Sequence, residues 1–172
     1  MAIRSENKND YEAITNINHL AFGQKNEGEM IINLRVNKGF IPELSLVYEE
    51  DNKLIGHILF YPLDIVNNNI RFNSLSLAPV AVLPDFQSMG IGSQLIEAGL
   101  SKAKEIGFTS CVVLGHPKYY PKFGFERASK WNIKPPVDEI PDEAFMAIEM
   151  LPGSLKGKSG IVEFPKEYYG AL

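Results

Sequence analysis

Two glycines one residue apart, Gly90 and Gly92, follow an apolar run and begin a long amphipathic segment. The first turn of a helix leaves backbone N–H groups without partners, and the helix macrodipole adds partial positive charge there. Glycine at this point lets a ligand approach the backbone without meeting a Cβ. The stretch Val80–Ser93 therefore predicts a binding site for an anion, above all a phosphate or pyrophosphate.

Two common nucleotide-binding motifs compete for this turn, and both fit it weakly. A dinucleotide G-x-G-x-x-G would need glycine at position 95, where the chain has Leu95. That motif would also lie in the first strand–helix unit of the chain, rather than after several hairpins. A P-loop would need Gly-Lys-Ser/Thr, which the sequence lacks.

Residues suited to acid–base or nucleophilic chemistry lie further along the chain. His116 follows a predicted buried strand, at the edge where open α/β sheets place ligands, although a hinge role before Pro117 is the stronger interpretation. Cys111 stands inside that strand without a visible base partner, which favours a buried structural thiol over a nucleophile. His19 and His57 are also interpreted as structural residues.

Helices and strands inferred from apolar periodicity would position these residues. The pattern predicts helices over 10–22, 27–38 and 90–107, and strands over 2–5, 44–50, 54–66, 70–83, 108–114 and 144–150, with a further strand starting at Gly124. The run 77–83 is apolar throughout, which indicates burial on both faces. A bulge or local loss of pairing is expected near Pro79, because proline donates no ladder hydrogen bond. The strand–helix–strand unit ending at 114 should be parallel and right-handed.

Composition limits the classes of function. The 172 residues are 45% apolar, carry a net charge of −4 and include a single cysteine. We expect one domain, 1–172, in the cytoplasm and without a membrane partner, because no stretch could span a bilayer and no signal-peptide core begins the chain. The acidic balance argues against nucleic-acid binding. One cysteine forms no internal disulfide and builds no zinc site alone, so no metal is expected.

A motif and its surroundings point to a family. The segment Gln87-Ser88-Met89-Gly90-Ile91-Gly92 matches the coenzyme A motif Gln/Arg-x-x-Gly-x-Gly/Ala. With the apolar strand before it, the long helix after it and the block Tyr120-Pro121-Lys122-Phe123-Gly124-Phe125, the chain resembles the GNAT N-acetyltransferase superfamily over nearly its whole length. The block from His116 to Phe125 is most similar to the bacterial YhbS-like subgroup.

The resemblance implies a GNAT-like α/β (α+β) fold, in which helices flank a mixed, mainly antiparallel sheet with a central βαβ unit. It also implies acetyl-CoA as co-substrate, no metal, and roles for individual residues. The pyrophosphate would be held by the backbone amides of Ser88, Met89, Gly90, Ile91, Gly92 and Ser93, and Gln87 would also belong to the cofactor site. The strand edge at Ala81, Val82 and Leu83 would pair with the pantetheine amides, in a slot opened by the irregularity near Pro79.

Tyr120 is the implied general acid, which would protonate the leaving thiolate; the alternative is a tyrosine that packs against the core. We expect an amine acceptor, on a small molecule, peptide or protein, that attacks the thioester directly in a ternary complex. An amine must lose a proton before attack, and its base stays open among His116, Glu29, Asp64 and Asp85.

Other interpretations remain beside the enzyme. A non-catalytic acyl-CoA-binding or sensory module on the same fold is the alternative, and transfer of a longer acyl group also stays open. Tyr168, Tyr169 and the apolar C-terminus could serve a homodimer contact.

Overall fold

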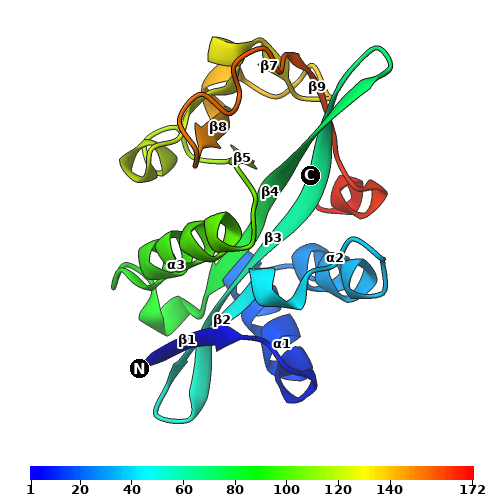
Figure 1. Ribbon diagram of the computed structural model, residues 1–172. Helices are drawn as coiled ribbons and strands as arrows, with labels where there is room; N and C mark the ends of the chain where they lie inside the picture. The colour runs from blue at the N-terminus through cyan, green and yellow to red at the C-terminus, as the bar shows by residue number, and fades with distance from the viewer. The chain divides into compact units, whose positions relative to one another are not determined.

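A computed structural model describes all residues, 1–172 (Figure 1). The chain forms two compact units, which we describe separately. Unit 1 comprises Met1–Tyr61, Ala78–Lys102 and Lys166–Leu172, and unit 2 comprises Pro62–Leu77 and Ala103–Pro165. Strands β3 (Lys53–Asn67) and β4 (Ile70–Val82) and helix α3 (Ile91–Glu105) contribute residues to both units.

The sheet of unit 1 contains β1 (Ala2–Ser5), β2 (Ser45–Glu50) and the first half of β3. β1 pairs antiparallel with β2, and β2 pairs antiparallel with β3. Asp51 and Asn52 close the β2–β3 hairpin with left-handed φ values of 49° and 60°, a conformation that these residue types tolerate. A register shift between Tyr48 and Glu49 marks a β-bulge in the hairpin.

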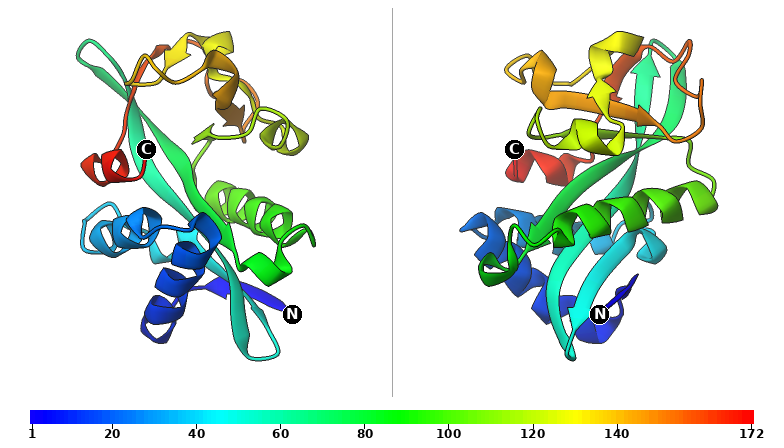
Figure 2. Two further views of the ribbon diagram at one scale, coloured as in Figure 1. Left: turned by 180° about the vertical axis from the view of Figure 1, so that it is seen from behind. Right: turned by 90° about the vertical axis from the view of Figure 1, so that its left-hand side faces the viewer.

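Helices cover both faces of this sheet. Helices α1 (Tyr11–Phe22) and α2 (Asn26–Arg35) lie on one face of β3, and α3 lies on the other (Figure 2). The alternation of side chains along β3 explains this arrangement, since His57 reaches Asn18 of α1 while Phe60 packs on Gly99 of α3. Gly23 ends α1 in the left-handed conformation, with φ 65°.

Unit 2 is built around β5 (Ser110–Leu114), which runs parallel to β4 at the pair Ser76–Val112. β8 (Phe145–Glu149) pairs antiparallel with β5 and with β6 (Glu126–Arg127). β9 (Gly160–Glu163) pairs antiparallel with the end of β3 and parallel with β7 (Ile133–Lys134). The chain therefore has nine strands. The mostly antiparallel pairing and the parallel β4–α3–β5 connection were predicted, whereas β7 and β9 were not.

Several boundaries differ from the prediction by one to three residues, and two of them have a local physical cause. Helix α2 ends at Arg35, because the following residues form turns in which Asn37 N–H donates to Leu34 O and Phe40 N–H donates to Asn37 O. The strand expected at Gly124 begins only at Glu126, since Gly124 adopts a left-handed φ of 102° that ends a short 3₁₀ helix.

Pro79 lies inside β4, and the Ala78–Pro79 peptide is cis. The predicted loss of pairing beside Pro79 stays a prediction. None of the helices combines the length and the apolar character needed to cross a membrane.

Candidate active site

The turn between β4 and α3 presents backbone groups in an unusual conformation. After the 3₁₀ helix Pro84–Phe86, Ser88 and Gly90 both adopt left-handed φ values, 63° and 83°. The first helical hydrogen bond runs from Gln94 N–H to Gly90 O, so the amides of Ile91 and Gly92 come before it. A Cβ on Gly90 would meet no atom within 4 Å, which means that φ rather than crowding favours glycine there. Such a turn at a helix start suits an anion.

Side chains around this turn hold its shape. The Gln87 side chain donates to Val82 O at 3.0 Å, which ties the turn back to the end of β4. Met89 points away from the core, with 63% of the residue exposed. The first turn of α3 rests on β3 at Gly56, where a Cβ would come within 3.1 Å of Ile91 and 3.0 Å of Leu95. No local pattern in the sequence indicates that Gly56 supports the turn, because the neighbours of Gly56 come from distant segments.

The end of β4 alternates between the core and a half-buried face. Ala81 and Leu83 are buried, whereas Val82 between them is half-buried. Leu83 N–H donates to Ile55 O at 2.9 Å, so this part of the strand is held to β3 along one edge. The position predicted for pantetheine is thus an ordered strand end directly before the turn.

Tyr120 lies in unit 2, at the start of a 3₁₀ helix (Tyr120–Phe123) that follows β5. Its ring centroid lies 5.2 Å from that of Tyr119 and 5.7 Å from that of Phe125, the latter in an edge-on arrangement. The residue is 9% exposed, and burial raises the pKa of the Tyr120 phenol to about 12. No protein group hydrogen-bonds to its hydroxyl, which is not among the fully buried unpartnered atoms either. A protonated phenol is thus available to a proton acceptor.

The residues considered as bases lie in ordinary surroundings. His116, Glu29 and Asp85 are exposed. Asp64 is half-buried and accepts from Arg71 at 3.0 Å, in a surface ion pair. No group of three His, Cys, Asp or Glu residues is arranged to hold a metal ion.

Cys111 is buried as predicted. It lies in β5 with no exposed surface, and burial raises the pKa of its thiol. A thiol kept protonated is a poor nucleophile, so the structural interpretation of Cys111 is confirmed.

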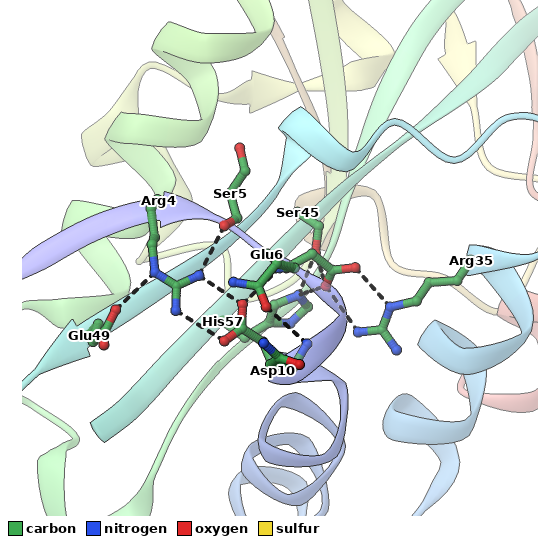
Figure 3. Close-up of polar contacts among 10 residues, drawn as sticks. Arg4, Ser5, Glu6, Asp10, Arg35, Ser45, Glu49 and His57 are labelled. Atoms are coloured by element: carbon green, nitrogen blue, oxygen red, sulfur yellow. Dashed lines mark hydrogen bonds and ion pairs between the residues drawn. The ribbon is translucent and has the colours of Figure 1, made fainter. Parts of the chain in front are cut away.

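A buried polar network in unit 1 escaped the sequence analysis (Figure 3). The Arg35 guanidinium donates to both carboxylate oxygens of Glu6, at 2.8 and 3.0 Å. Ser45 Oγ donates to Glu6 Oε2 at 2.7 Å and lies 2.8 Å from His57 Nε2. Asn18 Nδ2 lies 3.4 Å from His57 Nδ1. These residues come from separate segments of the chain, which no local pattern in the sequence connects.

The direction of each hydrogen bond fixes the state of His57. Ser45 gives its one hydroxyl hydrogen to Glu6, so it accepts from His57 Nε2–H, and His57 Nδ1 accepts from Asn18. The imidazole is therefore neutral, and burial together with the positive charge of Arg35 lowers its pKa to about 3. His57 is structural, because it has no exposed surface and both ring nitrogens are engaged.

A second ionic cluster lies beside this network (Figure 3). Arg4 binds both carboxylate oxygens of Asp10 and also Glu49, at 2.7 to 3.0 Å. The Arg4 guanidinium lowers the pKa of the Asp10 carboxyl, and Asp10 in turn accepts from Asn7 N–H at 2.7 Å. The cluster fastens β1 to β2 and to the start of α1.

Comparisons with known proteins agree with this architecture. Residues 11–125, from α1 through Phe125, match the model of the acetyltransferase (GNAT) family. The N-acetyltransferase YjhQ of Escherichia coli K12 is 34% identical over 136 residues, 79% of this chain and 75% of YjhQ. The N-acetyltransferase YhbS of the same organism is 27% identical over 168 residues, 98% of both chains.

Solved structures extend the similarity to three dimensions. The crystal structure of Escherichia coli YhbS in complex with CoA matches with a TM-score of 0.89 at 28% identity, over 98% of this chain and 91% of that one. A GNAT family acetyltransferase from Brucella melitensis, in complex with acetyl-CoA, matches with a TM-score of 0.79 at 31% identity, over 97% of both chains. The fold, the β4–α3 turn and these relatives together identify the chain as a member of the acetyltransferase (GNAT) family.

Proposed function

We propose that the protein is an acetyl-CoA-dependent N-acetyltransferase that moves the acetyl group to an amine of a small molecule, peptide or protein. The observation that carries the proposal is the β4–α3 turn, where two left-handed residues precede a helix start that can hold an anion. The CoA and acetyl-CoA complexes of the similar YhbS and Brucella melitensis proteins support the same choice of co-substrate.

In this proposal the pyrophosphate binds at the turn formed by Gln87, Ser88, Met89, Gly90, Ile91, Gly92 and Ser93. Backbone N–H groups donate to it, and Gln87 keeps the turn in place through Val82 O. The pantetheine arm lies along Ala81, Val82 and Leu83 and pairs as an added strand. No metal takes part.

The chemistry is direct acyl transfer. The acceptor nitrogen attacks the thioester carbon, the C–N bond forms, and the C–S bond breaks with its electron pair on sulfur. Tyr120 gives its phenolic proton to that sulfur, and the nitrogen loses a proton to His116, an acidic residue or water. A phenol pKa of about 12 keeps Tyr120 protonated, and therefore ready as an acid, throughout the neutral range.

We propose cytoplasmic residence, with neither nucleic acid nor membrane as partner. Tyr168 is buried and packs against Tyr61, with ring centroids 6.5 Å apart, so only Tyr169 and Leu172 stay exposed for a homodimer contact.

Tyr120→Phe tests the catalytic role. We expect kcat with acetyl-CoA and a productive amine to fall by about 10²–10⁴-fold, the scale of lost acid catalysis, with acetyl-CoA affinity nearly unchanged. Thiol release gives the rate, and calorimetric titration gives the affinity. Tyr119→Phe is the matched control, since it removes a hydroxyl from the neighbouring residue.

Each outcome of this experiment has one meaning. Full activity in Tyr120→Phe would remove Tyr120 from the acid role. Tight acetyl-CoA binding by the unaltered protein without turnover on any amine of a broad panel would favour a binding or sensory module instead.

A further inference from the structure

Gly115 is the first residue after β5, and the ring of Tyr120 lies against it. Its N–H donates to Ala144 O at 2.9 Å, which anchors it beside β8. A Cβ built on Gly115 would come within 3.0 Å of Tyr120 Cδ2 and 3.3 Å of Cζ, and would approach Cε2 more closely still. Gly115 is not among the residues with left-handed φ, so its backbone alone would accept alanine. The ring of Tyr120 is what occupies the space.

The Tyr120 ring cannot retreat freely from an added side chain. Tyr119 and Phe125 pack against it, and Phe125 is itself buried. When a methyl group is added to a closely packed interior, a neighbouring side chain is forced away from its preferred position. A methyl group at position 115 would therefore displace the ring, and the hydroxyl at its end would move with it.

We propose that Gly115 is a positioning residue for Tyr120, whose lack of a side chain sets where the phenolic hydroxyl lies. This inference rests on the proposed role of Tyr120 as the acid. Proton transfer to the departing sulfur requires the hydroxyl within hydrogen-bond reach, so displacement of the ring slows that step. Binding of acetyl-CoA does not depend on it.

Gly115→Ala provides the first measurement. We expect kcat to fall by about 10²-fold, the scale of an ångström-sized misplacement, with the acetyl-CoA affinity and KM preserved. Gly170→Ala is the matched control, because position 170 has no left-handed φ and a Cβ there would meet nothing within 4 Å. Unchanged kcat in Gly115→Ala would overturn the proposal.

A double-mutant cycle with Tyr120→Phe separates positioning from general damage. Once the hydroxyl is gone, Gly115→Ala should lower kcat no further, so the two effects are far from additive. Equal losses from Gly115→Ala in both backgrounds would contradict the positioning role while leaving Tyr120 as the acid. No loss in Tyr120→Phe itself would instead contradict the proposed acid.

A second variant covers the case in which Gly115→Ala does not fold. Phe125→Leu loosens the ring from its other side without crowding. The same cycle applies, and its loss of kcat should likewise disappear in the Tyr120→Phe background. Additive losses would again overturn the inference.

Discussion

The buried network around His57 and the surroundings of Tyr120, which we call its aromatic seat, treat buried polar groups in opposite ways. The network gives its polar groups hydrogen-bond partners, and the seat does not. In the network, each donated hydrogen ends on a partner, from Asn18 through His57 and Ser45 to the Glu6 carboxylate that Arg35 holds. The seat of Tyr120 is made of rings and a bare glycine backbone, which leave the hydroxyl without a partner from the protein.

The difference shows that surroundings, more than residue type, decide which group is available for chemistry. Histidine is the side chain best suited to proton transfer near neutral pH, yet His57 is neutral, enclosed and structural. Tyrosine is a weaker acid by its ordinary pKa, yet Tyr120 keeps an unengaged proton.

Arg35→Ala should break the network most severely. The side chains of Arg35 and Glu6 are 7% and 2% exposed, so the substitution leaves a buried carboxylate without its cation, at a cost of about 3–5 kcal/mol in the free energy of unfolding. Urea denaturation measures the loss. Arg71→Ala is the control, because Arg71 binds Asp64 and Glu163 at the surface and should change stability little. Equal effects from the two arginines would end the comparison.

His57 should make stability depend on pH. Its folded-state pKa of about 3 lies below its ordinary value of 6.5, so the unfolded chain takes up the proton first. The stabilisation is fully present above pH 6.5 and is lost as pH falls toward 3, amounting to about 2 kcal/mol between pH 7 and pH 5. Urea unfolding at the two pH values tests this against His57→Gln, which should show a flatter dependence. The same slope in both proteins would contradict the assignment.

Tyr119→Leu tests how much the aromatic seat of Tyr120 contributes to stability, and we expect the smallest effect of the three substitutions. The substitution removes the contacts of the Tyr119 ring, whose centroid lies 5.2 Å from that of Tyr120 and 5.3 Å from that of Phe123. It should lower the free energy of unfolding by about 0.5–1.5 kcal/mol. Thermal unfolding measures it against Tyr169→Leu, whose ring is half exposed. A loss as large as that of Arg35→Ala would mean that the aromatic seat also holds the fold together.

The sequence predicted most accurately what is continuous along the chain. The apolar end of β4, the glycines of the turn and the periodicity of α3 are consecutive, so their order predicts the strand, the turn and the helix start that the structure shows. Tyr120 was singled out by the family resemblance of one short block, Tyr120 to Phe125. The environment of its hydroxyl depends on Gly115 and Phe125. Their contacts with the Tyr120 ring form only in the folded unit, where β5 and β8 are paired, and so could not be predicted from the sequence.

The network was beyond prediction for a physical reason. Ser45 and His57 become neighbours through the β2–β3 register, which the bulge between Tyr48 and Glu49 shifts. Glu6 and Arg35 join them only when β1 and α2 pack on that hairpin. Charged residues usually lie at the solvated surface, and nothing in the local sequence distinguishes Glu6 and Arg35 from such surface residues.

The buried cysteine of β5 can serve as a built-in probe of local unfolding. Cys111 is the single thiol of the chain, and in the folded state it is both inaccessible and protonated. A thiol reagent added to the native protein therefore reacts with no protein thiol, which gives coenzyme release assays a low background. Under mild denaturant the same reagent reacts with Cys111 only when β5 is exposed. The labelling rate therefore measures how often unit 2 unfolds.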